Sequence, residues 1–262
     1  AAQVELQGRV AQSSLELDDA NQALSKSEAR LALALKASEL GLWDWNLQTD
    51  EVHHTQLEEL LGIEPAFVTG MPSQLKPRLH PEDLPPLRRA LVEHLKGRSE
   101  DYQIEYRVRH GDGHWVWIED RGRAVQRSPA GRVLRMVGTR RDISVSKDLE
   151  EQRQLAATVF EAASEGIVIL DPNYALIAVN QAFSRVSGYQ MEDLLGRNVV
   201  ELPCSRDARR HFPSIQKALE QSGHWQGELV EARKNGELYP QWLQLSVVRD
   251  PRGNVSHIVG FF

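Results

Sequence analysis

The chain has 262 residues, 31 of them basic and 37 acidic, and a net charge of −6. This length predicts two domains of roughly 100 to 150 residues each. Both charge signs are interspersed, which excludes the clustered Lys and Arg of a nucleic-acid surface. No apolar run approaches the ~20 residues of a membrane span, and no signal peptide is recognisable. A single cysteine, Cys204, excludes an internal disulfide and fits a reducing cytoplasm.

Residues 1–36 predict one long helix with a heptad seam. The stretch contains no proline, and Val10, Leu17, Leu24 and Leu31 recur at intervals of seven. A helix whose only apolar feature is a narrow stripe needs another helix to cover it, and a second copy of the chain is the natural partner. We therefore expect a dimerising coiled coil, with its two helices either parallel or antiparallel. Packing against the following domain is the alternative.

From about Gly41 to Ser144 the sequence forms a pattern that returns between Gly166 and Phe262. Glycines at turns and helix ends recur at offsets of 125, 126, 123 and 122 residues: Gly41 and Gly166, Gly62 and Gly188, Gly113 and Gly236, and Gly138 and Gly260. Offsets this steady indicate two copies of one domain. Duplicated small domains with different pocket residues are more typical of sensors or docking modules than of enzymes.

Turns and apolar alternation give the elements of the first copy. Residues 42–46 predict a strand, and helices are predicted at 55–61 and 83–96. Three long strands joined by glycine-containing turns complete this copy: 102–110, 114–125 and 132–143.

The second copy repeats this order. Strands are predicted at 166–170 and 176–179, helices begin at 181, 191 and 207, and three strands begin near 225, 238 and 255. Two strands, several short helices and three strands predict an α+β domain, a five-stranded antiparallel sheet flanked by helices. A cavity between the sheet and the helices is the expected place for a small ligand.

Both copies resemble PAS sensory domains. The first carries GLWDWN at 41–46 and EYRVRHGDGHWVWIEDRG at 105–122, and the second carries EGIVILD at 165–171 and RKNGELYPQWLQLSVVRD at 233–250. The resemblance divides the chain into a signalling helix (1–36), a first PAS domain (37–144), a connecting helix (145–163) and a second PAS domain (164–262). It implies sensing or dimerisation, with an effector domain on the same polypeptide.

Signals leave such domains through a short motif after the last strand, which Asp142, Ile143 and Ser144 resemble with serine in place of threonine. In related proteins the aspartate bonds back to its own domain, and a side-chain oxygen suits a helix start. We expect one helix to run from this motif through 145–163, with an inert spacer as the alternative. The second copy ends at Phe262, and its own exit motif would be expected after that residue.

Cofactor chemistry finds little support. Blue-light relatives place a reactive cysteine after Gly-Arg-Asn, but Val199 follows that triplet here, and Cys204 is expected to be structural. The histidines that could serve heme are His80, His94 and His211, of which His80 precedes Pro-Glu-Asp and fits a helix cap better. We expect no cofactor, with heme disfavoured.

Non-covalent FAD in the second domain is the small-molecule alternative, because its sequence also resembles redox-sensing PAS domains. The residues named for that cleft are Asn180, Asn198, Trp225, Glu228 and Trp242. No metal is expected: His53 and His54, or His110 and His114 beside a hairpin turn, show no clear carboxylate partner at ligand spacing.

No nucleophile elbow, phosphate loop or metalloprotease helix is present, so we expect a non-catalytic regulatory fragment. The motifs GHWQGEL and RKNGELYPQWL most resemble PAS domains that precede a diguanylate cyclase and phosphodiesterase pair of the GGDEF/EAL type in bacterial cyclic-di-GMP signalling. A histidine kinase sensor, an FAD redox sensor and a structural dimerisation spacer remain alternatives. A homodimer, an unidentified small-molecule ligand and a cytoplasmic location are expected, with upstream anchoring to the inner membrane left open.

Overall fold

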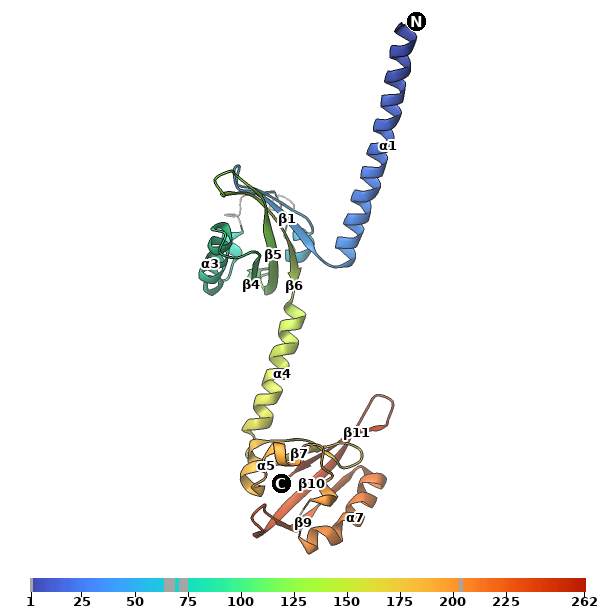
Figure 1. Cartoon of the computed structure of the whole chain (residues 1–262). Helices are drawn as coiled ribbons and strands as arrows, with labels where there is room; N and C mark the ends of the chain where they lie inside the picture. The colour runs from blue at the N-terminus through green and yellow to red at the C-terminus, as the bar shows by residue number, and fades with distance from the viewer. Residues whose placement is uncertain (1, 64–68, 71–74, 203–204) are drawn as a thin grey trace. The chain divides into compact units, whose positions relative to one another are not determined.

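The computed structural model describes residues 2–63, 69–70, 75–202 and 205–262, and the backbone alone for residues 2–16 and 69–70. The chain divides into two compact units, residues 1–149 and 150–262, each built around its own sheet (Figure 1). Cys204 lies outside the described residues. No helix in the described portion combines the length and the apolarity that crossing a membrane requires.

Two long helices flank the first domain in sequence. Helix α1 (Ala2–Ala37) confirms the predicted N-terminal helix. Leu17, Leu24 and Leu31 are each more than half exposed on it, and the side chain of Val10 lies outside the description. Helix α4 (Ser144–Ala162) follows the first domain, and its apolar residues Val145 and Val159 are also exposed.

The first sheet is antiparallel, in the order β3-β2-β1-β6-β5-β4. The five strands that build it are β1 (Gly41–Asn46), β2 (Glu51–His54), β4 (Tyr102–Arg109), β5 (Trp115–Arg127) and β6 (Val133–Asp142), and the two-residue β3 (Thr69–Gly70) extends its edge. Strand β2 was not indicated separately by the sequence, because Val52 is its one apolar residue.

The second sheet has the order β8-β7-β11-β10-β9, the same arrangement of five strands. Its strands are β7 (Ile167–Leu170), β8 (Leu176–Val179), β9 (His224–Ala232), β10 (Leu238–Arg249) and β11 (Val255–Phe261). Two antiparallel five-stranded sheets with flanking helices confirm the predicted α+β class.

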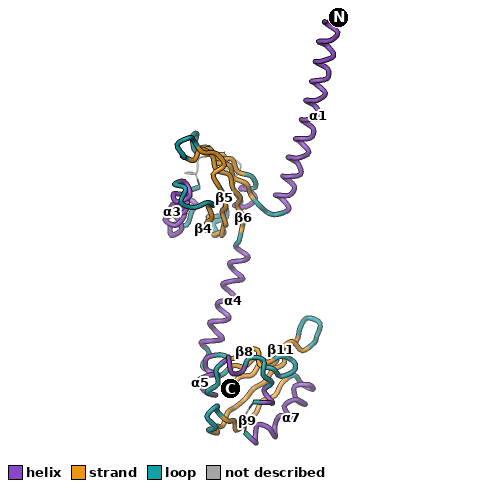
Figure 2. The backbone as a smooth tube through the Cα atoms, in the orientation of Figure 1, coloured by secondary structure: helices purple, strands orange, loops and turns teal. Residues whose placement is uncertain are grey.

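Short helices occupy the chain between β2 and β4 in the first domain and between β8 and β9 in the second (Figure 2). In the first domain they are α2 (Leu57–Leu61), the 3-10 turns η3 (Lys76–Arg78) and η4 (Pro81–Asp83), and α3 (Leu84–Leu95), which packs on β4. In the second they are α5 (Gln181–Ser187), α6 (Met191–Leu194), η5 (Val199–Glu201) and α7 (Arg206–Ser222), which packs on β9 and β10.

The repeated glycines are structurally equivalent in the two domains. Gly62 and Gly188 each end a helix in the left-handed conformation, with φ of 58° and 78°, which glycine adopts without strain. Gly138 and Gly260 lie on the last strands, where an added Cβ would come within 2.3 Å of the Trp43 ring and 2.7 Å of Val168 respectively. The offsets read from the sequence therefore mark backbone positions with the same steric demand in both copies.

Candidate functional site

A cavity of about 280 Å³ lies between the second sheet and its helices. Its walls are mainly apolar, and they come from both layers of the domain: Val168, Phe183, Phe212, Ile215, Leu243 and Leu245. Val199, the residue after the Gly-Arg-Asn triplet, also lines it. An apolar cavity with a few polar groups is the usual form of a small-molecule site.

Three polar groups of this cavity lie where β9 meets β10, and Ser187 of α5 and Arg209 of α7 also line it. Glu231, Tyr239 and Gln241 line it, and the Tyr239 hydroxyl donates a hydrogen bond to Gln241 Oε1 at 3.0 Å. The Arg233 guanidinium lies 4.4 Å from the centre of the Tyr239 ring. Burial raises the pKa of the Glu231 carboxyl, and it raises the pKa of Tyr239 to about 12. In both cases burial stabilises the uncharged form relative to the charged one, as expected in an apolar surrounding.

The structure places none of the five residues predicted for the cleft in the lining of this cavity. Asn180 is 1% exposed and caps α5: its Oδ1 accepts hydrogen bonds from the N–H groups of Ile167 and Phe183, both at 2.9 Å. Its Nδ2 donates to the carbonyls of Phe160 and Glu165, so the amide is fully engaged with backbone. Such an amide organises the domain and has no capacity left for a ligand.

Asn198 has a similar role on a more exposed turn. Its Oδ1 accepts from Val200 N at 3.0 Å and so caps η5. Its Nδ2 donates to Asn173 O at 2.7 Å. Asn180 and Asn198 lie outside the lining of this cavity because an asparagine before a helix serves the free backbone N–H groups first.

The other three predicted residues lie on the strands outside the cavity. Trp225 is half-buried beside the core. Glu228 and Trp242 are exposed cross-strand partners, on the opposite sheet face from Leu229 and Leu243. Alternation along β9 and β10 assigns the cavity to Glu231, Tyr239 and Gln241 instead, and this period of two was readable from the sequence.

The first domain encloses a smaller cavity of about 130 Å³ beside a buried polar cluster. Asp120 is the centre of the cluster. It accepts hydrogen bonds from Trp43 Nε1 at 2.5 Å, from the Tyr106 hydroxyl at 2.7 Å and from Arg140 Nη2 at 3.0 Å. These four side chains are only 4 to 8% exposed. The buried carboxylate is thus paired with a cation and held by two further donors, which offsets its desolvation.

Two atoms in this cavity have no hydrogen-bond partner among the described residues: His54 Nδ1 and Arg140 Nε. Burial, followed by the charge of Arg140, lowers the pKa of His54 to about 3. The imidazole is therefore neutral at neutral pH. His54 and Arg140 both line this cavity, whose apolar wall combines the rings of Trp43 and Trp45 with leucine and valine side chains.

The predicted exit motif adopts a more specific arrangement than expected. Asp142 Oδ1 accepts from Ser144 N at 2.7 Å, so the carboxylate serves the start of α4. Ser144 Oγ accepts from Trp117 N at 3.0 Å, and Ile143 N donates to Trp117 O at 2.9 Å. The tie between the helix and the sheet therefore runs through Ser144 and the buried Ile143, with an ion pair between Lys147 and Glu105 beside them, whereas related proteins were expected to use the aspartate.

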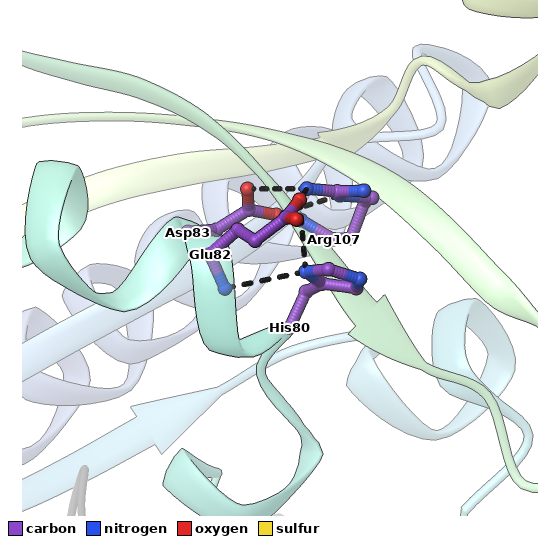
Figure 3. A network of polar contacts seen from close by, with 4 residues as sticks. All are labelled: His80, Glu82, Asp83 and Arg107. Carbon is purple, nitrogen blue, oxygen red and sulfur yellow. Dashed lines mark hydrogen bonds and ion pairs between the residues drawn. The ribbon is translucent and has the colours of Figure 1, made fainter.

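Trp117 also links the exit to the capping element at residues 80–83. Arg107 lies 5.1 Å from the ring centre of Trp117, and Lys147 of α4 lies 5.2 Å from it. The Arg107 guanidinium donates two hydrogen bonds to the Asp83 carboxylate, from Nε at 2.9 Å and from Nη2 at 2.8 Å, and Glu82 lies beside it (Figure 3).

His80 occupies the capping position that the sequence indicated. Its Nδ1 accepts from Glu82 N at 3.3 Å at the start of η4 (Figure 3). His94, another heme candidate, is 1% exposed and uses both ring nitrogens, toward Ser99 O and Ala124 N. His211 bonds Asp207 O at 2.9 Å. None of these three histidines lines either cavity. The expectation of no heme stays a prediction that this placement favours.

A carboxylate missed by the sequence analysis joins two histidines at the β4–β5 hairpin. Asp112 Oδ1 lies 3.0 Å from His110 Nδ1 and 2.5 Å from His114 Nδ1. The hydrogen bond from His114 N, with help from the His110 side chain, lowers the pKa of Asp112 to about 2. The spacing His-x-Asp-x-His could have revealed the trio, since a tight turn brings alternate side chains together.

Comparison with known proteins assigns both domains. Residues 53–140 match a family model described as PAS fold, and residues 164–262 match one described as PAS domain. The nitrogen fixation regulatory protein of Klebsiella oxytoca is 32% identical over 100 residues, covering 38% of this chain and 20% of that protein. Oxygen sensor protein DosP of Escherichia coli is 24% identical over 231 residues, covering 82% of this chain and 27% of its own length.

Solved structures of sensory proteins also match. A sensory box histidine kinase/response regulator from Burkholderia thailandensis shares 32% identity over 49% of this chain and 95% of that chain, with a TM-score of 0.43. The N-terminal domain of a diguanylate cyclase with PAS/PAC sensor from Marinobacter aquaeolei shares 31% identity over 41% of this chain and 98% of that chain, with a TM-score of 0.37.

The chain spans less than a third of the length of the two curated relatives described above. Its two sheets have the same strand order, and each of its domains is matched separately by a PAS model. The chain therefore contains two PAS domains in tandem, and its relatives are sensory and regulatory proteins.

Proposed function

We propose that this chain is the ligand-responsive region of a larger bacterial signalling protein, in which the second PAS domain binds a small molecule. The observation that carries the proposal is the 280 Å³ cavity, a mainly apolar space in which Glu231, Tyr239 and Gln241 lie on neighbouring strands and Arg209 lies on the helix side. The DosP match supports a sensory role, because it spans 82% of this chain and belongs to a protein named as a sensor.

The ligand class follows from the size and lining of the cavity. Its volume is at the small end of the range of about 300 to 1,000 Å³ found for ligand sites. A compact apolar molecule with one hydrogen-bonding end, directed at Tyr239 and Gln241, would satisfy these walls. The FAD alternative loses support, since its five proposed contacts lie elsewhere. A flavin absorption band in protein purified from its native host would restore it.

A cavity-filling variant tests the site. Native mass spectrometry of the 262-residue chain, purified from its host, identifies a retained ligand, and thermal-shift screening supplies one otherwise. Ala208→Phe and the milder rim substitution Val200→Trp, both in the lining, should abolish binding. Trp242→Phe, on the exposed sheet face, is the control and should bind normally. Equal binding by the lining variants and the control would overturn the proposal.

We infer that the fragment itself is not catalytic. In the first cavity the charged groups Asp120 and Arg140 are engaged with each other. Among the described residues, the lining of the second contains Ser187 but no histidine to serve as its base. The effector we propose is a diguanylate cyclase and phosphodiesterase pair beyond residue 262, on the basis of GHWQGEL and RKNGELYPQWL, with a histidine kinase as the alternative. Activity assays of the parent protein with each substrate class decide between them.

Transmission is proposed to use the exit motif and α4. Asp142→Ala in the parent protein removes the acceptor at the start of α4 and should change the output activity by uncoupling the first domain from the second, while ligand binding by the second domain stays the same. If the output were indifferent to this change, α4 would be a spacer.

Dimerisation is proposed to use α1. Leu17, Leu24 and Leu31 expose 62, 57 and 59% of their surface, and their heptad spacing suits a partner helix. Analytical ultracentrifugation should show a dimer for residues 1–262 and a monomer for residues 37–262. An unchanged mass on removing residues 1–36 would place the dimer contact elsewhere.

A further inference from the structure

Three electron-pair donors converge at the tip of the β4–β5 hairpin: His110 Nδ1, Asp112 Oδ1 and His114 Nδ1. They all lie within 4.8 Å of one another, and the two imidazole rings stack with centres 4.5 Å apart. This cluster is separate from both cavities. From this geometry we propose that the hairpin binds a divalent transition-metal ion, for which zinc is the reference case.

The hairpin backbone fixes where the histidines stand. His110 N donates to His114 O at 2.8 Å, which places the two residues opposite each other at the hairpin end. Gly111 N donates to Leu61 O at 2.7 Å and ties the turn to the end of α2. The His110 ring packs directly on Gly62, where an added Cβ would lie 2.3 Å from the ring. One ligand is thus positioned before any ion arrives, which lowers the ordering cost of binding.

The donor and acceptor roles of His110 and Asp112 also favour a cation between their side chains. His110 Nδ1 lies 3.3 Å from Asp112 N and 3.0 Å from Asp112 Oδ1, so it accepts from the amide or donates to the carboxylate according to the ring tautomer. In the tautomer that donates, a proton lies between the ring nitrogen and the carboxylate oxygen, and a metal ion would take the place of that proton. A metal ion satisfies both of them and His114 Nδ1 together.

Coordination requires only a small adjustment. Zinc binds histidine nitrogen and carboxylate oxygen at about 2.0 to 2.2 Å, so tetrahedral ligand atoms stand about 3.3 Å apart. The present separations of 3.0 and 2.5 Å from Asp112 Oδ1 must widen by less than 1 Å. The Asp112 and His114 side chains are 63 and 58% exposed, so both have room to turn. Water completes the coordination from the open side.

The donor set defines the metal class. Two imidazoles and one carboxylate suit zinc, nickel, copper or cobalt, whereas calcium and magnesium prefer oxygen ligands throughout. The equivalent turn of the second domain, residues 233–237, reads Arg-Lys-Asn-Gly-Glu and offers no histidine. The proposed site is therefore specific to the first domain, where the ion would pin the hairpin to the end of α2 and so add an input beyond ligand sensing.

Titration of the tag-free 262-residue chain with ZnCl₂ in a calorimeter tests the proposal. We expect one zinc per chain, with affinity reduced at least tenfold by His114→Ala and by Asp112→Asn. His110→Ala should act in the same way, but its ring packs on Gly62, so the exposed His114 variant carries the test if His110→Ala fails to fold. His53→Ala and His224→Ala, both exposed histidines outside the cluster, are the controls and should bind zinc normally.

Cobalt provides an independent readout, because its visible absorption reports nitrogen and oxygen ligation directly. A cobalt spectrum in the native chain that disappears in His114→Ala supports the site. Absence of stoichiometric zinc binding by the native chain would overturn the proposal, and so would undiminished binding by the His114→Ala and Asp112→Asn variants.

Discussion

The two domains share a backbone plan, yet the residues that face their helices differ in kind. In the first domain a buried ion pair, two further donors and a neutral histidine surround a cavity of about 130 Å³. In the second domain the cavity measures about 280 Å³ and is mainly apolar.

Sheet register shows that this difference is one of substitution at matching positions. Counting from the equivalent glycines Gly138 and Gly260 and across the paired strands aligns the polar cluster with apolar residues of the second sheet. The matches are Trp43 with Val168, His54 with Val179, Tyr106 with Leu229, Asp120 with Leu243, and Arg140 with Phe262. The same fold therefore supports a cross-linked interior in one copy and an open apolar pocket in the other.

The largest expected effect comes from breaking the ion pair. Asp120→Leu leaves the 8% exposed Arg140 unpaired and should destabilise the first domain by about 3 to 5 kcal/mol. Hydrogen exchange followed by mass spectrometry on the whole chain measures each domain separately, and exchange in the second domain should not change. Asp101→Ala, which breaks the exposed pair with Arg123, is the control and should cost less than about 1 kcal/mol.

Adding Arg140→Phe to Asp120→Leu sharpens the comparison, because the pair then carries the residues of the second domain. The double variant should be more stable than Asp120→Leu alone, since no buried charge is left without a partner. A double variant less stable than the single one would mean that Arg140 has another indispensable partner.

The next effect concerns two equivalent side chains that hold the start of each sheet. Thr55 Oγ1 accepts one hydrogen bond, from Leu42 N at 2.8 Å, whereas Asn180 makes four. Asn180→Ala should cost about 2 to 3 kcal/mol in the second domain, because it removes a cap and leaves buried backbone groups unpaired. Thr55→Ala should cost about 1 kcal/mol in the first. Equal costs in a hydrogen-exchange measurement would contradict the proposed difference.

A smaller effect is expected at the exit of the first domain. Ser144→Ala removes the acceptor for Trp117 N and should lower protection of the β5–α4 junction by about 1 kcal/mol. Ser144→Thr retains the hydroxyl and should preserve it. Hydrogen exchange at residues 140–150 provides the measurement, and indifference to both substitutions would assign the junction to Ile143 and to the contacts of Lys147.

The smallest effect is a difference in acid sensitivity. The folded first domain lowers the pKa of His54 from 6.5 to about 3, so the unfolded chain binds the proton first and stability from this group falls between pH 6.5 and 3. His54→Val, which installs the residue of the second domain, should flatten that part of the profile. Glu231 acts with the opposite sign. Burial raises the pKa of its carboxyl, so the stability that this group contributes falls as the pH rises through the raised pKa. Urea unfolding monitored between pH 4 and 8 tests both directions.

Much of the fold followed from local sequence. The glycine offsets identified the duplication because turns and close strand contacts constrain the backbone without reference to distant residues. The strands with clear alternation and the capping role of His80 were likewise legible in short windows. Strand β2 was not, since its sequence Glu-Val-His-His carries little apolar signal and its place depends on pairing with β1.

The residues that line the cavities meet through contacts between distant parts of the sequence. The sequence alone indicated two related domains and a helix with a heptad stripe, because each rests on spacing within one segment, and the exit motif stays a prediction from family resemblance. Only the tertiary structure assigned Asn180 and Asn198 to backbone capping and brought Asp120 to Arg140 across neighbouring strands. The physical reason is that strand pairing, helix packing and desolvation decide which side chains meet inside a cavity, and they act between residues far apart in the chain.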